Sequence, residues 1–394
     1  YAILSGLVGS EMCIRDRHKA RCGIATYTQQ LRDHLSIKSK VCSLPERVDH
    51  QLLDTSITSF INQSVKYDAV HIQHEHGLFT GDGDESDAIE RLGDMLKQLS
   101  KINKPVFVTF HSDPVFYTDK RTWSGEGMLR SLLSGMWRKQ VSKWFQPKYN
   151  VHAVVHTNRT KQEFVQSQFS KHNTHVIPHG VINRDITHKP IDLNGDVNLS
   201  IFGFISSYKG YNVALQALEL LPKKYKLVCM GGRHPTSEGD EYTDILRRAY
   251  DIDKGILENK LNKFGHHKVR DRVTITGYLD DTQADQWHDK TDICLAPYTD
   301  KTLSGSGALT WSITSGRPTI ASDIPSFKSI NKQYGCMHLF KTDAHFELAW
   351  AIRHVAENEH VQQNILSGAK RYTNQLSWSN VADMHMDLYK SKIK

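Results

Sequence analysis

The stretch IFGFISSYKGYNVALQAL, residues Ile201–Leu218, decides the fold class. An apolar strand ends at Phe204, a Ser-rich loop carries Lys209 and Gly210, and an amphipathic helix begins at Tyr211. The N–H groups and the positive dipole end of a helix N-terminus suit a phosphate group, Lys209 adds a full charge, and Gly210 allows close backbone approach. An ordinary strand-to-helix turn with a solvated lysine is an equal alternative on these local grounds, because the stretch has neither a Walker nor a GxGxxG pattern.

A second loop of the same kind lies in PYTDKTLSGSGALTWSITSGRPTIASD, residues Pro297–Asp323. The run Ser304–Gly307 follows a strand and leads into a helix expected over Ala308–Ser315, with Gly316 as its C-cap. Such a loop suits a diphosphate, while the alternative is a flexible connector. Two such loops in one half of the chain favour phosphate binding more than either does alone.

Strand-like apolar runs alternate with helix-like stretches along the chain, which predicts a parallel α/β architecture. The polar segment Asn183–Asp196 contains Pro and Gly and indicates a linker, after which the pattern restarts. Two α/β domains are therefore expected, with ligands at the carboxyl ends of strands. The expected strands are Ala69–Gln73, Val106–Phe110, Ala153–Val155 and His175–Ile177 before the linker, and Leu199–Phe204, Lys226–Met230, Val273–Thr276, Ile293–Ala296 and Pro318–Ala321 after it.

The composition excludes several classes of protein. With 394 residues, of which 39% are hydrophobic, the chain can bury the cores of two domains. The formal net charge of +7 indicates a mild bias toward anionic partners such as nucleotides and is too small to indicate nucleic-acid binding. The six cysteines form no CxxC pair, so neither a zinc site nor a redox dithiol is indicated, and their sparse use fits a reducing cytosol. No apolar run approaches the ~18–20 residues that span a bilayer.

The first seventeen residues, YAILSGLVGSEMCIRDR, read as a non-native leader. They lack the basic n-region and the cleavage site of a signal peptide. The charged residues Arg15, Asp16 and Arg17 suit a buried strand poorly. The first strand of the fold is therefore expected to be makeshift or missing, and the segment dispensable or harmful. The alternative is a genuine first strand of odd composition.

The two Gly/Ser loops, together with the tail WSNVADMHMDLY (Trp378–Tyr389), resemble the donor domain of retaining GT-B glycosyltransferases of family four, the group 1 type. Further pieces resemble other parts of that family, and their order and spacing are more specific than any single motif. These pieces are RCGIATYTQQL (Arg21–Leu31), YDAVHIQHEHGLF (Tyr67–Phe79), VFVTFHSDP (Val106–Pro114), HVIPHGV (His175–Val181) and GGRHPTSEGDEY (Gly231–Tyr242).

The resemblance implies the GT-B fold, with two Rossmann-like parallel-sheet domains facing across a cleft. The implied boundaries are a leader at 1–17, an acceptor-side domain at 18–182, a linker at 183–197, a nucleotide-sugar donor domain at 198–372, and a C-terminal helix at 373–394 that packs back on the N-terminal domain.

The resemblance also implies an activity. Members of the family move a hexose from a nucleotide-diphosphate sugar to a hydroxyl acceptor, with retention of configuration and without a metal or cofactor. The implied setting is cell-surface polysaccharide or glycolipid synthesis, with a sugar or lipid-linked acceptor. A cytoplasmic location is expected, and peripheral contact with the inner membrane face stays open.

Residue roles carry over motif by motif. Lys209 and His111 take the catalytic places: Lys209 and the amides of Ser306–Ala308 would stabilise charge on the leaving diphosphate, and His111 would orient the sugar or acceptor. The implied donor-binding residues are Gly210, Asp300, Ser304, Gly305, Ser306, Gly307 and Ala308, and the implied acceptor-side residues are Gly23, His74, Glu75 and His179.

The sequence departs from the family at three positions. Leu303 and Trp311 stand where the family usually has two glutamates, and its arginine ahead of the phosphate lysine is absent. Leu303 cannot bind a sugar hydroxyl, and Trp311 offers only an N–H donor and is expected to pack apolar surface. Asp300, Ser304 and Ser306 are expected to take over these contacts. A degenerate module that binds a nucleotide sugar without turnover is the alternative that the lost glutamates favour.

Other patterns suggest different chemistry. The histidines around His74 and His111 lack HExxH spacing, so substrate contact is favoured over a metal. Asp82 and Asp84 form a DxD, but in an acidic Gly-rich loop that favours a solvated segment. A second alternative of the same fold is a sugar-nucleotide epimerase or a phosphorylase. An epimerase would need acid–base carboxylates, for which Glu75 is the one strong candidate. The basic amphipathic stretch Met128–Trp144 fits a helix packed on the sheet better than one lying on a membrane.

Overall fold

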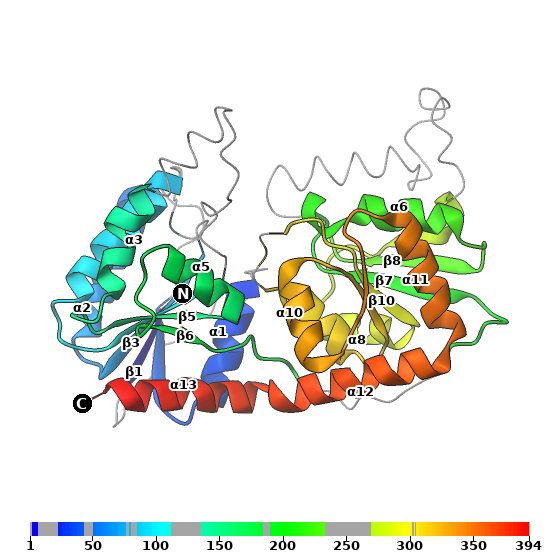
Figure 1. Cartoon of the computed structure of the whole chain (residues 1–394). Coiled ribbons are helices and arrows are strands. Elements are labelled where there is room, and N and C mark those ends of the chain that lie inside the picture. The colour runs from blue at the N-terminus through cyan, green and yellow to red at the C-terminus, as the bar shows by residue number, and fades with distance from the viewer. Residues whose placement is uncertain are drawn as a thin grey trace. The chain divides into compact units, whose positions relative to one another are not determined.

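The computed structural model describes residues 2–6, 23–42, 50–75, 79, 85–111, 135–183, 190–232, 269–301, 303 and 305–393. The chain divides into two compact units (Figure 1). The first unit comprises Tyr1–Gly180, Thr302–Gly305 and Leu376–Lys394, and the second comprises Val181–Lys301 and Ser306–Gln375.

The first unit contains a six-stranded sheet in the order β2-β1-β3-β4-β5-β6. Strands β3 to β6 run parallel, as predicted. Their bounds, in the order of the sheet from β2, are β2 (Lys38–Cys42), β1 (Ala2–Gly6), β3 (Ala69–His74), β4 (Val106–Phe110), β5 (Val151–Val155) and β6 (Thr174–Val176).

The first strand is present but pairs irregularly for this fold, in line with the makeshift strand that was one of the two expectations. Residues Ala2–Gly6 form a strand between β2 and β3, so the strand is not missing. It runs antiparallel to both neighbours, pairing Ile3 with Val41 and with His71, where a Rossmann-like sheet would have a parallel strand. The charged residues 15–17 lie outside the described residues.

Different helices cover the two faces of this sheet (Figure 1). Helices α2 (His50–Ser64) and α3 (Glu85–Leu99) cover the face that carries the apolar core, while α1 (Gly23–His34) and α13 (Trp378–Lys392) pack against each other on the other face. Side chains alternate along a strand, so β3 sends Val70 and Ile72 into the core and His71 to the face of α13.

The described part of the basic amphipathic stretch packs on the sheet. Residues 135–140 are helical and Trp137 is fully buried in the core of the first unit, next to Phe110. The 3-10 turn η2 (Ser142–Phe145) follows it, and α5 (Asn158–Gln166) lies beside β5 and β6. Over these residues the packed-helix interpretation is the one the structure favours.

The second unit contains a second six-stranded sheet, in the order β12-β11-β10-β7-β8-β9, and all of its pairs are parallel. The helices and strands of this unit are β7 (Val197–Phe202), η3 (Ser207–Lys209), α6 (Tyr211–Leu220), β8 (Tyr225–Met230), η4 (Arg270–Arg272), β9 (Val273–Ile275), α8 (Asp281–Asp289), β10 (Ile293–Ala296), α9 (Gly307–Thr314), β11 (Thr319–Ser322), α10 (Pro325–Tyr334), β12 (His338–Phe340), α11 (His345–Glu357) and α12 (Glu359–Gln375).

The carboxyl ends of β7, β8 and β10 meet at one edge of the second sheet. The amide of Gly203 donates to the carbonyl of Met230 at 3.0 Å, and a Cβ on Gly231 would lie 2.1 Å from the carbonyl oxygen of Gly203. The loops that follow these strands are thereby held against one another, which positions the site described next. Of the helices in the described residues, none is long and apolar enough to cross a membrane.

Candidate donor-phosphate site and the histidine face

The loop after β7 makes the turn that the sequence predicted. Ser207–Lys209 form one 3-10 turn, and Gly210 then adopts a left-handed φ of +70° before α6 begins. A Cβ on Gly210 would lie 1.8 Å from the carbonyl oxygen of Pro297, in the loop after β10. Only glycine fits there, and its absence of a side chain lets the two predicted phosphate loops touch.

Lys209 is buried, not solvated, so the alternative of a solvated lysine is wrong. Its side chain is 4% exposed, and its Nζ donates to the Oη of Tyr298 at 2.7 Å. The ammonium also lies 4.7 Å from the ring centroid of Tyr298 and 5.4 Å from that of Tyr208. Burial lowers the pKa of Lys209, and Tyr208 partly opposes this.

Tyr298 joins Lys209 to the start of α9. Its Oη lies 3.0 Å from the Oγ of Ser306, which caps α9 by accepting from the amide of Leu309 at 3.2 Å. Burial raises the pKa of Tyr298 to about 12, so this hydroxyl stays neutral at physiological pH. One continuous chain of hydrogen bonds therefore links the two Gly/Ser loops.

The direction of these hydrogen bonds follows from what each group can donate. An ammonium and an amide N–H only donate, so Lys209 donates to Tyr298 and Leu309 donates to Ser306. Either hydroxyl could donate in the Tyr298–Ser306 hydrogen bond, and we assign the hydrogen to Tyr298 because its buried hydroxyl has no other acceptor in the described part of the chain, whereas Ser306 is partly exposed. Tyr298 and Tyr208 are the side-chain hydrogen-bond partners of Lys209, so at least one N–H group of its ammonium is left without an acceptor among the described residues, as is the hydroxyl hydrogen of Ser306 under this assignment.

Other donors of the second unit belong to the same two loops. The Oγ of Ser306 caps the amide of Leu309, the third residue of α9. The amides of Gly307 and Ala308 come before it, in the first turn of the helix. The Oγ of Ser206, at the start of η3, is buried and has no hydrogen-bond partner among the described residues. Within those residues no carboxylate forms an ion pair with Lys209. The arrangement is a set of donors with one positive charge, which suits an anion with several oxygens.

The remaining predicted donor-binding residues are Asp300, Ser304 and Gly305, and the two positions where the family has glutamates are Leu303 and Trp311. Asp300 is partly buried and has interactions within the chain, Gly305 is partly buried, and Ser304 lies outside the described residues. Trp311 packs against Phe202, with ring centroids 5.1 Å apart, in keeping with its expected apolar role. Leu303 is partly buried.

Two predicted residues of the first unit, His111 and His179, lie around Tyr27 of α1. The ring centroid of Tyr27 is 4.7 Å from that of His111 and 5.0 Å from that of His179, and the unpredicted His156 lies 5.6 Å away. Burial holds the pKa of His111 well below its ordinary value, and His156 and His179 lower it further. His111 is therefore neutral at physiological pH, and its Nε2 lies 2.8 Å from the Oε1 of Gln73.

The other acceptor-side predictions are placed differently. His74 is 1% exposed and stacks on Phe79 on the core side of the sheet, on the opposite face from the histidines around Tyr27. Glu75 follows β3 and is partly buried, and Gly23 is the first residue of α1. The roles of these three residues stay predictions.

The sequence reasoning missed Tyr298, Gln73 and His156. Each lies at or just past the carboxyl end of a strand, where ligand-binding residues of open α/β sheets gather, so their position was the available signal. Gln73 and Tyr298 lie within the quoted stretches Tyr67–Phe79 and Pro297–Asp323, but no pattern in those stretches distinguishes them from their neighbours. The described residues hold no group of three or more His, Cys, Asp or Glu side chains placed to bind a metal ion, and Asp82 and Asp84 lie outside them.

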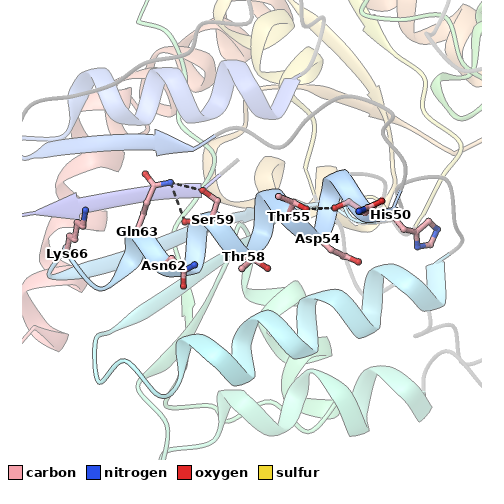
Figure 2. A pocket seen from close by; sticks show the side chains of 9 residues that line it. His50, Asp54, Thr55, Thr58, Ser59, Asn62, Gln63 and Lys66 are labelled. Carbon is pink, nitrogen blue, oxygen red and sulfur yellow. Dashed lines mark hydrogen bonds between the residues drawn. The ribbon is translucent and has the colours of Figure 1, made fainter.

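A groove of about 930 Å³ runs along the polar face of α2 (Figure 2). Two of its hydrogen bonds join lining residues of α2: Thr55 donates to the carbonyl of Gln51, and Gln63 donates to the Oγ of Ser59. The groove contains none of the predicted site residues. Its lining residues are His50, Gln51, Asp54, Thr55, Thr58, Ser59, Asn62, Gln63 and Lys66.

Comparisons with known proteins agree with the fold. The family model described as Glycosyl transferases group 1 matches residues 183–372. No curated protein matches the chain by sequence.

Solved structures are similar over most of the chain. The Anabaena protein Alr3699/HepE in complex with UDP has a TM-score of 0.60 at 14% identity, covering 86% of this chain and 83% of that one. Sucrose-phosphate synthase from Thermosynechococcus elongatus has 0.61 at 17%, covering 90% and 83%. A glycosyltransferase from Rickettsia africae has 0.62 at 14%, covering 90% and 85%. The chain has the GT-B fold, with two Rossmann-like domains, and the family match together with this fold supports a group 1 glycosyltransferase.

Proposed function

We propose that this protein is a retaining glycosyltransferase that moves a sugar from a nucleotide-diphosphate sugar to a hydroxyl acceptor. The observation that carries the proposal is the buried ammonium of Lys209, which meets only neutral groups among the described residues and lies beside the donors of Ser306 and α9. A diphosphate supplies the missing charge and acceptors. Alr3699/HepE, one of the similar structures, is described in complex with UDP and with UDP-glucose.

In the proposed reaction the acceptor oxygen bonds to the anomeric carbon as the bond from that carbon to the diphosphate breaks. Negative charge grows on the leaving diphosphate, and Lys209, with the Ser306 hydroxyl and the first amides of α9, stabilises it. Fixed donors aimed at developing charge are usually the largest contribution to such catalysis. The proton of the acceptor hydroxyl passes to the departing phosphate, so the step requires neither a carboxylate base nor a metal ion.

For the first unit we propose that neutral His111 orients the sugar or the acceptor hydroxyl. A neutral imidazole can donate and accept a hydrogen bond, and its burial keeps it in that form. As the acceptor class we propose a sugar or a lipid-linked sugar, which is what the family resemblance implies.

The proposal is tested by calorimetry with UDP, GDP and their sugars, followed by transfer assays with the donor that binds. Lys209→Ala should reduce transfer by a factor on the order of 10²–10³. Lys223→Ala removes an exposed lysine from the same unit and should leave transfer unchanged.

Two outcomes would contradict the proposal. Near-normal transfer by Lys209→Ala would show that Lys209 does not stabilise the leaving diphosphate. Millimolar or weaker binding of every nucleotide, unchanged by Asp300→Ala with Ser306→Ala, would leave a degenerate module without turnover.

A further inference from the structure

We propose that Tyr298 is a positioning residue of the phosphate site, whose hydroxyl holds the Lys209 ammonium in place and turns the hydroxyl hydrogen of Ser306 toward the ligand. The identity of that ligand, a nucleoside diphosphate, rests on the proposed function. The effect on Lys209 and Ser306 does not, because it follows from the hydrogen bonds of the protein alone.

Tyr298 is held in place independently of any ligand. Its side chain is 2% exposed, and its backbone carbonyl accepts from the Oγ of Ser322 at 2.6 Å. Its ring packs against Phe327 at 5.2 Å between centroids and edge-on to Tyr208 at 5.7 Å. The hydroxyl therefore stays at one point between the two phosphate loops.

From this point the hydroxyl acts on both neighbours at once. Its oxygen accepts one hydrogen of Lys209, which directs the remaining N–H groups of the ammonium elsewhere. With its hydrogen assigned to the Oγ of Ser306, that oxygen accepts from Tyr298 as well as from the amide of Leu309. With its oxygen used twice as an acceptor, Ser306 can only donate to a further partner. A phosphate oxygen is an acceptor, so both neighbours are set to receive it.

The space around the ammonium reinforces the positioning. A Cβ on Gly203, which has a φ of +106°, would lie 2.9 Å from the Nζ of Lys209 and 3.2 Å from the Cβ of Ala308. The lysine side chain thus crosses the bare backbone of Gly203. Among the described residues, the titratable side chains that face the ammonium are Tyr208 on its own turn and Tyr298 on the loop after β10.

Tyr298→Phe removes the hydroxyl and keeps the ring that packs on Phe327. The variant should bind UDP about tenfold to a hundredfold more weakly at pH 7, since a hydrogen bond to a charged group contributes ~1.5–3 kcal/mol. Without the acceptor oxygen, Lys209 should also lose its proton at lower pH than in the wild type. When the pH is raised from 6 to 10, the affinity for UDP should therefore begin to fall at a lower pH in the variant than in the wild type.

The matched control is Tyr225→Phe. Tyr225 is 1% exposed and lies at the amino end of β8, whereas the site lies at the carboxyl ends of the strands. The Tyr225→Phe variant also loses a buried hydroxyl, but both its affinity for UDP and the pH dependence of that affinity should be unchanged. A Ser306→Ala variant and the double variant complete a cycle, in which the two substitutions should be non-additive because they act on one hydrogen-bonded chain.

A measurement without ligand separates this inference from the proposed function. The Cε signal of Lys209, followed by ¹³C NMR against pH and assigned with Lys209→Met, should show a lower midpoint in Tyr298→Phe than in the wild type. An unchanged midpoint, or an unchanged affinity for UDP in Tyr298→Phe, would overturn the role of Tyr298. If the wild type binds no nucleotide but the midpoint is still lower in Tyr298→Phe than in the wild type, the proposed function is overturned and the positioning of Lys209 by Tyr298 is kept.

Discussion

Replacing Lys209 by Met should raise the stability of the protein while it removes nucleotide binding. Lys209 is 4% exposed, its ammonium has the neutral hydroxyl of Tyr298 as a hydrogen-bond acceptor with Tyr208 beside it, and it has no carboxylate partner in the described part of the chain. The effective penalty for burying an ion is several kcal/mol, while a hydrogen bond from a charged group returns ~1.5–3 kcal/mol. A Met of similar length removes both, so the free energy of unfolding should rise by about 1–2 kcal/mol.

The assay is thermal and urea unfolding of the full chain, wild type against Lys209→Met, without ligand. For a unit of this size the expected gain corresponds to about 2–8 °C in the transition of the second unit. Lys223→Met, at an exposed position, should change the midpoint little.

The pH dependence gives the same reasoning a second test. The pKa of Lys209 is lowered from 10.5 in the folded protein, so between that lowered value and 10.5 the unfolded chain binds more protons than the folded one. Stability of the wild type should therefore rise with pH in this window relative to Lys209→Met, and the advantage of the variant should shrink. A variant that is less stable than the wild type at pH 7 would refute the reasoning, because it would show that Lys209 holds the fold together.

Three further outcomes are expected. Gly203→Ala should lower stability by about 1–3 kcal/mol and weaken nucleotide binding, because its φ of +106° suits glycine and a Cβ would meet Lys209 at 2.9 Å; unchanged binding in a folded variant would contradict this. Gly180→Ala should destabilise the first unit by about 1–3 kcal/mol, since a Cβ would lie 2.4 Å from the Trp378 ring. Gly135→Ala is the control and should be neutral or stabilising, because its Cβ would meet nothing within 4 Å. Equal melting temperatures of the two variants would count against the packing argument. Transfer should survive EDTA, and a loss that Mn²⁺ or Mg²⁺ restores would show that the proposed metal-free mechanism is wrong.

The repetitive part of the fold could be predicted from sequence because it depends on local patterns. Buried parallel strands are short apolar runs, and β4 and β10 have the bounds that their runs, Val106–Phe110 and Ile293–Ala296, predicted. The turn at Gly210 was also visible, since a strand, a Gly and a helix follow one another along the chain. The direction of β1 was not, because it depends on how Ala2–Gly6 pairs with two distant strands.

The sequence alone determined that a lysine and a Gly/Ser loop follow two strands of one domain, and hence that a phosphate site was expected there. Tertiary structure alone decided that Lys209 is buried, that its partner is Tyr298, and that the Tyr298 hydroxyl reaches Ser306. Lys209 and Tyr298 are 89 residues apart in the chain, so no local pattern joins them. The parallel sheet brings the carboxyl ends of β7 and β10 to one edge, and that arrangement places the two side chains within hydrogen-bonding distance.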